Sequence, residues 1–161
     1  MSASLSYSGA GLFANGAYYT AADPTSGKTV AIGKTAAIGY TFGSLTTRAD
    51  WVNYLNPSST AALSNVNVFG LGGTYAFTPA MSADGAVYYA TNRGASENKS
   101  IMFAFGGQYF LSKRTTLYAQ VGVAHNKGVF QTNLAVLAPD SFAVPTGATT
   151  TAVNVGIRHT F

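Results

Sequence analysis

The sequence contains no cysteine among its 161 residues. Disulfide frameworks, thiolate metal sites and cysteine nucleophiles are therefore excluded. Charged residues make up only 9% of the chain, whereas soluble globular domains carry about 25%. No run of about 18 apolar residues occurs, so the low charge does not come from a membrane-spanning helix. Apolar residues must therefore alternate with other residues along the chain rather than form long blocks.

Aromatic residues (13%) and 18 glycines are abundant instead. An intrinsically disordered chain would be poor in aromatic and β-branched residues, so disorder is excluded as well. The net charge of +4 comes from nine Lys and Arg spread along the chain, and only Lys113 and Arg114 are adjacent. A nucleic-acid-binding protein would gather such residues in a tract or on one face.

Hydrophobicity repeats with a period of two almost everywhere. Between Val30 and Phe42, the even positions are mostly apolar and end in aromatic residues, whereas the odd positions are small or polar. This alternation predicts a strand whose two faces meet different environments. Nine segments read this way, and none reads as a helix: 4–8, 12–22, 30–42, 44–55, 66–78, 81–92, 99–111, 115–126 and 150–161. We therefore expect an all-β, antiparallel up-and-down meander.

The connections between these segments alternate in length. Tight turns follow the strands that end near Ser8, Phe42, Phe77 and Leu111. The other connections, at 23–29, 56–65, 93–98 and 127–149, are longer and rich in Gly, Ser, Thr, Pro and Asn. Short turns at one rim and long loops at the other are typical of a transmembrane outer-membrane β-barrel.

Aromatic residues gather at the short-turn ends of the predicted strands. Amphipathic rings prefer the lipid–water interface, so these residues predict a girdle at one side of the membrane. The residues are Tyr40, Phe42, Phe77, Tyr109 and Phe161. The same alternation predicts that Phe103, Phe105, Val121, Val155 and Ile157 point outward to lipid, opposite small and polar neighbours.

Four segments carry a resemblance to a known family. The stretch Tyr109-Phe-Leu-Ser-Lys-Arg-Thr-Thr-Leu-Tyr-Ala119, with the terminal Val155-Gly-Ile-Arg-His-Thr-Phe161, resembles the last strands of Gram-negative trimeric porins. Leu5-Ser-Tyr-Ser-Gly9 with Phe13-Ala-Asn-Gly-Ala-Tyr18 is similar to a mid-barrel hairpin of the same family. The resemblance implies a 16-stranded barrel in outer-membrane lipid, a homotrimer, and a terminal Phe161 that is read by the barrel-assembly machinery.

Nine strands are too few for such a barrel. The resemblance therefore implies that residues 1–161 are a C-terminal portion of a porin β-barrel domain. In these porins the N-terminal half carries the loop that folds inward and constricts the channel, and nothing in this sequence matches that loop.

Signals of catalysis are weak. Ala22-Asp-Pro-Thr-Ser-Gly-Lys-Thr29 nearly spells a phosphate-binding loop, but a strand rather than a helix follows it, so we expect an exposed loop. Two histidines and five carboxylates (Asp23, Asp50, Asp84, Glu97 and Asp140) show no metal-ligand spacing and no Gly-x-Ser-x-Gly elbow. We expect no enzyme activity, no metal and no cofactor.

Charged and amide side chains on the small-residue face are the better candidates for function. Arg48 and Asp50 are two positions apart, so they share one face of a strand. Charges above a water-filled lumen influence ion preference through their local field. The candidate pore-lining residues are Arg48, Asp50, Asp84, Gln108, Gln120 and Arg158. The alternative interpretation is that Arg48 and Asp50 only pair with each other in the wall.

The sequence thus favours an outer-membrane porin, a water-filled channel for passive diffusion of ions and small hydrophilic solutes. One alternative is a small eight-stranded outer-membrane barrel, without segment 4–8, that serves as an anchor or as an adhesin through loop 127–149. Such a barrel has an interior that side chains must fill, and the small inward residues predicted here would leave voids. A third interpretation, a soluble ligand-binding barrel, conflicts with the low charge.

Overall fold

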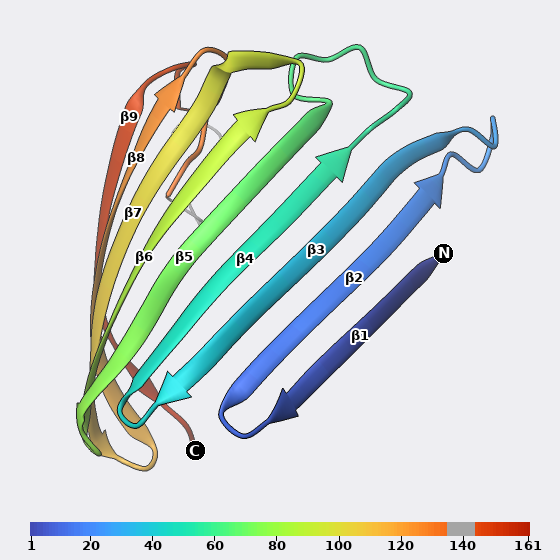
Figure 1. The fold of residues 1–161 in the computed structure, drawn as a ribbon. Coiled ribbons are helices and arrows are strands. Elements are labelled where there is room, and N and C mark those ends of the chain that lie inside the picture. The colour runs from blue at the N-terminus through green and yellow to red at the C-terminus, as the bar shows by residue number, and fades with distance from the viewer. Residues whose placement is uncertain (135–143) are drawn as a thin grey trace.

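The computed structural model describes residues 1–134 and 144–161, and these form one antiparallel sheet. Its strands follow chain order from β1 to β9, each paired with its sequence neighbours (Figure 1). The strands are β1 (Ser2–Gly9), β2 (Leu12–Ala22), β3 (Thr29–Phe42), β4 (Leu45–Leu55), β5 (Asn65–Thr78), β6 (Met81–Asn92), β7 (Ala95–Ser112), β8 (Thr115–Lys127) and β9 (Thr149–His159). The all-β, up-and-down architecture predicted from the sequence is confirmed.

The sheet is curved, like part of a barrel wall (Figure 1). Within the described residues β1 pairs only with β2 and β9 only with β8, so both edges are open. The eight-stranded alternative needs β2 paired to β9 with β1 set aside. The structure instead pairs β1 with β2 from Ser2 to Gly9, and that alternative is wrong for this arrangement.

The predicted difference between the two rims is largely present. Two-residue turns join β1–β2, β3–β4, β5–β6 and β7–β8 at one rim, which we call the short-turn rim. The β1–β2 turn holds Ala10 and Gly11 at φ of 51° and 80°, a left-handed pair that matches the twist of a hairpin. The opposite rim, which we call the loop rim, carries longer connections at 23–28, 56–64 and 128–148.

One predicted long loop is wrong. Residues 93–98 do not form a loop, because β7 already begins at Ala95 and only two residues turn the chain. The register between β6 and β7 jumps from Thr91↔Lys99 to Asn92↔Ala95, so the extra residues 96–98 are taken up as a bulge within β7. Polar residues at 96–98 resembled a loop because a bulge interrupts the alternation of a strand.

Little of the described chain is buried, as expected for a single-layered wall. The buried apolar residues are Ala124, Phe130 and Val144, all near the loop rim of β8. Large apolar side chains elsewhere are exposed, among them Phe105 at 61% and Val155 at 75%. No helix among the described residues is long and apolar enough to cross a membrane.

Candidate functional site

The two faces of the sheet have opposite chemistry. Directly paired residues share a face, so the register assigns every strand residue to one side. Phe105 pairs with Val121 and Gly85, and Val121 pairs with Val153, which gives a continuous apolar face. The five side chains predicted to face lipid (Phe103, Phe105, Val121, Val155 and Ile157) all lie on this face. We call it the outer face, and the opposite one the inner face.

The aromatic residues predicted for a girdle lie together at the short-turn rim of the outer face. The rings of Tyr40 and Phe42 are 4.4 Å apart, and those of Tyr75 and Phe77 are 5.0 Å apart. Tyr109 lies on the same face and is 49% exposed, and Phe161 follows β9 fully exposed, with its ring 4.8 Å from that of His159. The structure brings all five into one band.

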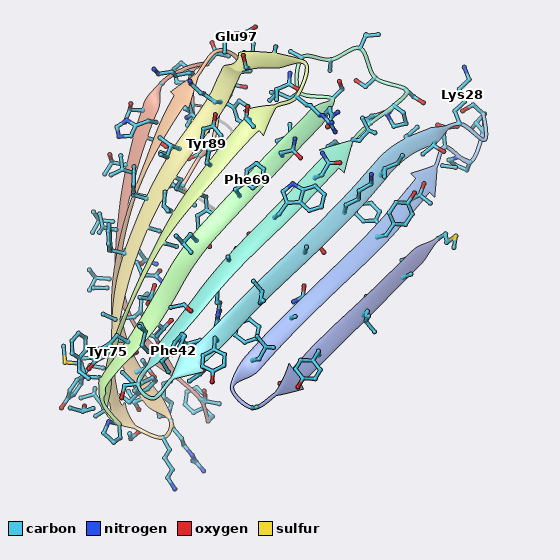
Figure 2. All side chains as sticks on the ribbon, viewed as in Figure 1. Lys28, Phe42, Phe69, Tyr75, Tyr89 and Glu97 are labelled. Atoms are coloured by element: carbon cyan, nitrogen blue, oxygen red, sulfur yellow. The ribbon has the colours of Figure 1, made fainter. Side chains whose placement is uncertain are left out.

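A second aromatic band was missed by the sequence analysis. Trp51 of β4 pairs with Phe69 of β5, and Phe69 pairs with Tyr89 of β6. All three lie on the outer face, nearer the loop rim. Figure 2 shows Phe69 and Tyr89 well separated from Phe42 and Tyr75 along the strands. Trp51 Nε1 donates to Asn67 Oδ1 at 3.1 Å. Each of these residues falls on the apolar side of the alternation in its predicted strand, and this was the signal that could have identified the second band.

The candidate pore-lining residues all lie on the inner face. Arg48 pairs with Gly39 and Gly72, and Asp50 pairs with Ala37 and Gly70. No ion pair joins Arg48 to Asp50 in the described structure. The Arg48 guanidinium carbon instead lies 5.7 Å from the ring centroid of Phe13, a cation–π distance.

On the inner face, larger side chains of one strand lie against glycines of the adjacent strand. A Cβ placed on Gly106 would lie 2.8 Å from Asp84 Oδ2, and one on Gly70 would collide with the carboxylate of Asp50. In each case the carboxylate belongs to the residue directly opposite the glycine. The same relationship holds for three aromatic side chains: Phe13 over Gly39, Tyr19 over Gly33 and Tyr118 over Gly156. These side chains therefore lie along the wall and leave the space in front of it open.

The other candidates gather on β7, β8 and β9. Gln108, Gln120 and Arg158 line an open depression of about 560 Å³ on the inner face, together with Thr116, Tyr118 and Asn154. A second depression of about 290 Å³ lies beside it, and Gln120 and Asn154 border both. Asp84 lines the second one. The two adjoining depressions thus bring together four of the six candidates, whereas Arg48 and Asp50 lie apart on β4.

Residues 22–29, which nearly spell a phosphate-binding loop, form the β2–β3 connection and no helix follows them. Asp23 Oδ1 accepts hydrogen bonds from the Ser26 and Thr25 amides at 2.7 and 2.8 Å, and from Ser26 Oγ at 3.1 Å. These bonds lower the pKa of Asp23 below its ordinary value, and the bond from the Ser26 amide has the largest effect. The carboxylate closes the loop on itself, so the loop is not shaped to receive a phosphate.

Titratable side chains do not assemble elsewhere in the described residues, where no group of three or more His, Asp or Glu could hold a metal ion. Asp140 lies outside the described residues. His159 Nδ1 contacts Thr115 Oγ1 at 2.9 Å and His125 Nδ1 contacts Thr149 Oγ1 at 3.1 Å. Both histidines thus lie on the outer face, each beside a threonine of the next strand.

Comparison with known proteins agrees with this two-faced wall. Residues 1–129 match the family described as Gram-negative porin. The chain belongs to the Gram-negative porin family. This membership places it in the bacterial outer membrane, in a family of diffusion channels. No curated protein matches the sequence.

Solved structures of outer-membrane proteins share the fold of this chain. An anion-selective porin from Comamonas acidovorans superposes with a TM-score of 0.78 at 21% identity, covering 98% of this chain and 48% of that chain. Outer-membrane expressed OmpT of Vibrio cholerae gives a TM-score of 0.69 at 12% identity, covering 97% and 54%. An in-vitro folded, trimer form of OmpT gives 0.68 at 15% identity, covering 97% and 54%. The chain spans about half the length of each of these proteins.

Proposed function

We propose that this chain forms part of the wall of a water-filled outer-membrane channel, through which ions and small hydrophilic solutes diffuse passively. One observation carries the proposal. A single sheet has a continuous apolar outer face and a polar inner face, on which larger side chains lie flat against glycines of the next strand. An apolar outer face is stable against hydrocarbon, and inner side chains that lie along the wall leave room for water. A filled eight-stranded barrel would need bulky inner residues instead.

We infer that further strands complete the barrel and that residues 1–161 act as its C-terminal portion. The open edges at β1 and β9 support this inference, because unpaired N–H and C=O groups cannot be left in hydrocarbon. The match to about half of each similar outer-membrane protein supports it as well. Both edge strands run toward the short-turn rim, so they cannot pair with each other in antiparallel fashion.

The proposed activity needs neither catalysis nor a cofactor. Transport follows concentration and potential gradients, and the wall contributes its width and its fixed charges. The described inner face carries two guanidinium groups, Arg48 and Arg158, and two carboxylates, Asp50 and Asp84. The similar Comamonas protein is described as anion-selective. In this chain the inner charges balance, so we propose that its half of the lumen favours neither sign strongly.

Three partners follow from the proposed channel. Outer-membrane lipid contacts the outer face between the two aromatic bands. A homotrimer is proposed because one similar outer-membrane protein is described as a trimer form. The exposed terminal Phe161 is proposed as the signal read by the barrel-assembly machinery.

The test is single-channel recording of the complete porin in planar bilayers, beside liposome swelling in sugars of increasing size. We expect stable openings that conduct both cations and anions, and liposome swelling rates that fall as the sugar becomes larger. A folded barrel that neither conducts nor admits sugars would contradict the proposal and favour an anchoring or adhesive role. Asn15→Ala on the inner face of β2 serves as a control for a polar wall substitution that leaves every charge in place.

A further inference from the structure

The connection between β8 and β9 folds over the inner face instead of extending away from the rim. Thr132 Oγ1 donates to Ser100 Oγ of β7 at 3.0 Å. The Leu134 side chain lies over Gly122 of β8, with Cδ1 3.2 Å from where a Cβ on that glycine would be. Ser100 and Gly122 are both inner-face residues. The described start of this connection therefore lies on the lumen side of the wall.

One buried amide ties the two limbs of the connection to the wall. Asn126, which is 4% exposed, donates from Nδ2 to the carbonyl oxygens of Thr132 at 3.1 Å and Ala148 at 2.8 Å. Its Oδ1 accepts from the Thr132 amide at 3.0 Å. Thr150 Oγ1 adds a bond to the Thr132 carbonyl at 3.1 Å. A single side chain thus holds both the outgoing and the returning limb.

A second set of contacts fixes the limbs to β7 and to each other. Asn98 Oδ1 accepts from the Val129 amide at 3.0 Å. Gln131 Nε2 donates to the Val144 carbonyl at 2.8 Å, and the Gly147 amide donates to the Phe130 carbonyl at 3.0 Å. Phe130 and Val144 are two of the three buried apolar residues in the described chain. Burial and satisfied hydrogen bonds both indicate a fixed element.

The element also changes the surface along which solutes would pass. Leu134 lines the 290 Å³ depression together with the polar residues Asp84, Gln120 and Asn154 and with small residues such as Ala104, Gly122 and Ala152, so its side chain covers part of the wall. Toward the short-turn rim the polar surface continues without such a cover to Arg158. A solute that follows the wall of β7 to β9 from the loop rim therefore meets the connection first.

We propose that residues 128–134 and 144–148, held by Asn126, obstruct the lumen and limit the size of solutes that pass. This inference rests on the proposed channel function. The alternative of a small adhesive barrel takes this connection as an external loop. The hydrogen bonds of Asn126 and Asn98 hold its described limbs inward instead.

Thiol labelling tests the position of the loop directly. The chain has no cysteine, so Leu134→Cys in the complete porin introduces one defined site on it. A bulky, membrane-impermeant thiol reagent should cause a stepwise loss of single-channel current. Thr60→Cys, on the exposed β4–β5 loop at the same rim, is the matched control and should be labelled without loss of current. Labelling of Leu134→Cys that leaves the current unchanged would overturn the proposal.

Shortening the connection tests its effect on size. Replacement of 129–147 by a short Gly-Ser turn should raise conductance on the order of twofold, since conductance follows the open lumen. Asn126→Ala should speed entry of the larger sugars relative to the smaller ones, whereas Asn15→Ala should leave this ratio unchanged. Folding of each variant is checked by its heat-modifiable gel mobility. Folded variants with wild-type conductance and sugar ratios would contradict the obstruction while leaving the channel intact. A wild-type porin that does not conduct would instead overturn the channel function itself.

Discussion

The carboxylate of Asp84 lies over Gly106, the residue directly opposite it on β7. A methyl group at Gly106 would be 2.8 Å from Asp84 Oδ2 and 2.9 Å from Oδ1. The glycine therefore determines where this negative charge rests. The carboxylate is the free end of a short side chain. It can therefore move toward the lumen when a methyl group is added at Gly106, at small cost in stability.

Gly106→Ala should consequently raise the cation preference of the complete porin. A carboxylate that stands away from the wall lies closer to permeating ions, where its field is stronger. Reversal potentials in a salt gradient measure the effect. Asp84→Asn should shift the potential in the opposite direction, and adding Gly106→Ala to Asp84→Asn should cause no further shift. An equal shift in both backgrounds would show that the alanine acts without the carboxylate.

Arg48 and Asp50 should influence ion preference separately, because no ion pair joins them in the described structure. Arg48→Ala should lower anion preference, and Asp50→Ala should raise it. Both effects should shrink as salt increases, since the screening length falls from about 10 Å at 0.1 M to about 3 Å at 1 M. Reversal potentials unmoved by either change would indicate that the two groups neutralise each other.

The assignment of the outer face can be tested by placing a charge on each side of one strand. Phe105 is 61% exposed on the outer face, and Ala104 lies next to it on the inner face. Phe105→Arg should cost about 2–4 kcal/mol near the middle of the bilayer. Ala104→Arg should be tolerated because its charge reaches water. Folding titrations into lipid vesicles measure both, and equal losses would refute the assignment.

The β2–β3 loop should loosen in acid. Hydrogen bonds from the Ser26 amide, the Thr25 amide and the Ser26 hydroxyl lower the folded pKa of Asp23. The stabilisation is therefore fully present above the ordinary Asp pKa of about 3.9 and is lost as pH falls through the folded value. The Ser26 amide resonance, followed by NMR in micelles, reports the change. Asp23→Asn should remove the titration, and a midpoint at or above the ordinary value would contradict the account.

Alternation in the sequence was enough to predict the sheet. The observed strands match the predicted segments within a few residues, because a wall between lipid and water imposes opposite chemistry on successive side chains. Among the strand starts, the largest differences are at Ala95 and Ser2, where β7 and β1 begin earlier than predicted. Both lie at the loop rim, where strands extend to residues that need not contact hydrocarbon and the alternation fades.

The inward position of the β8–β9 connection could not be predicted in this way. Its contacts depend on Asn98 and Asn126, which are ordinary polar residues in the sequence and become anchors only when β7 and β8 are paired. The seating of Asp84 over Gly106 likewise follows from strand register, which composition does not reveal. The register groups residues by side of the sheet as the alternation predicts, whereas contacts across strands and loops required the structure.

The claim that this sheet is part of the wall of a wider channel is tested most directly by planar-bilayer recording of the 161-residue chain alone, beside the complete porin. The open edges of β1 and β9 would each leave backbone groups unpaired in hydrocarbon, at several kcal/mol per group. We therefore predict stable, porin-sized openings from the complete barrel and none from the short chain. Stable openings of that size from the short chain, with no second polypeptide present, would contradict the account.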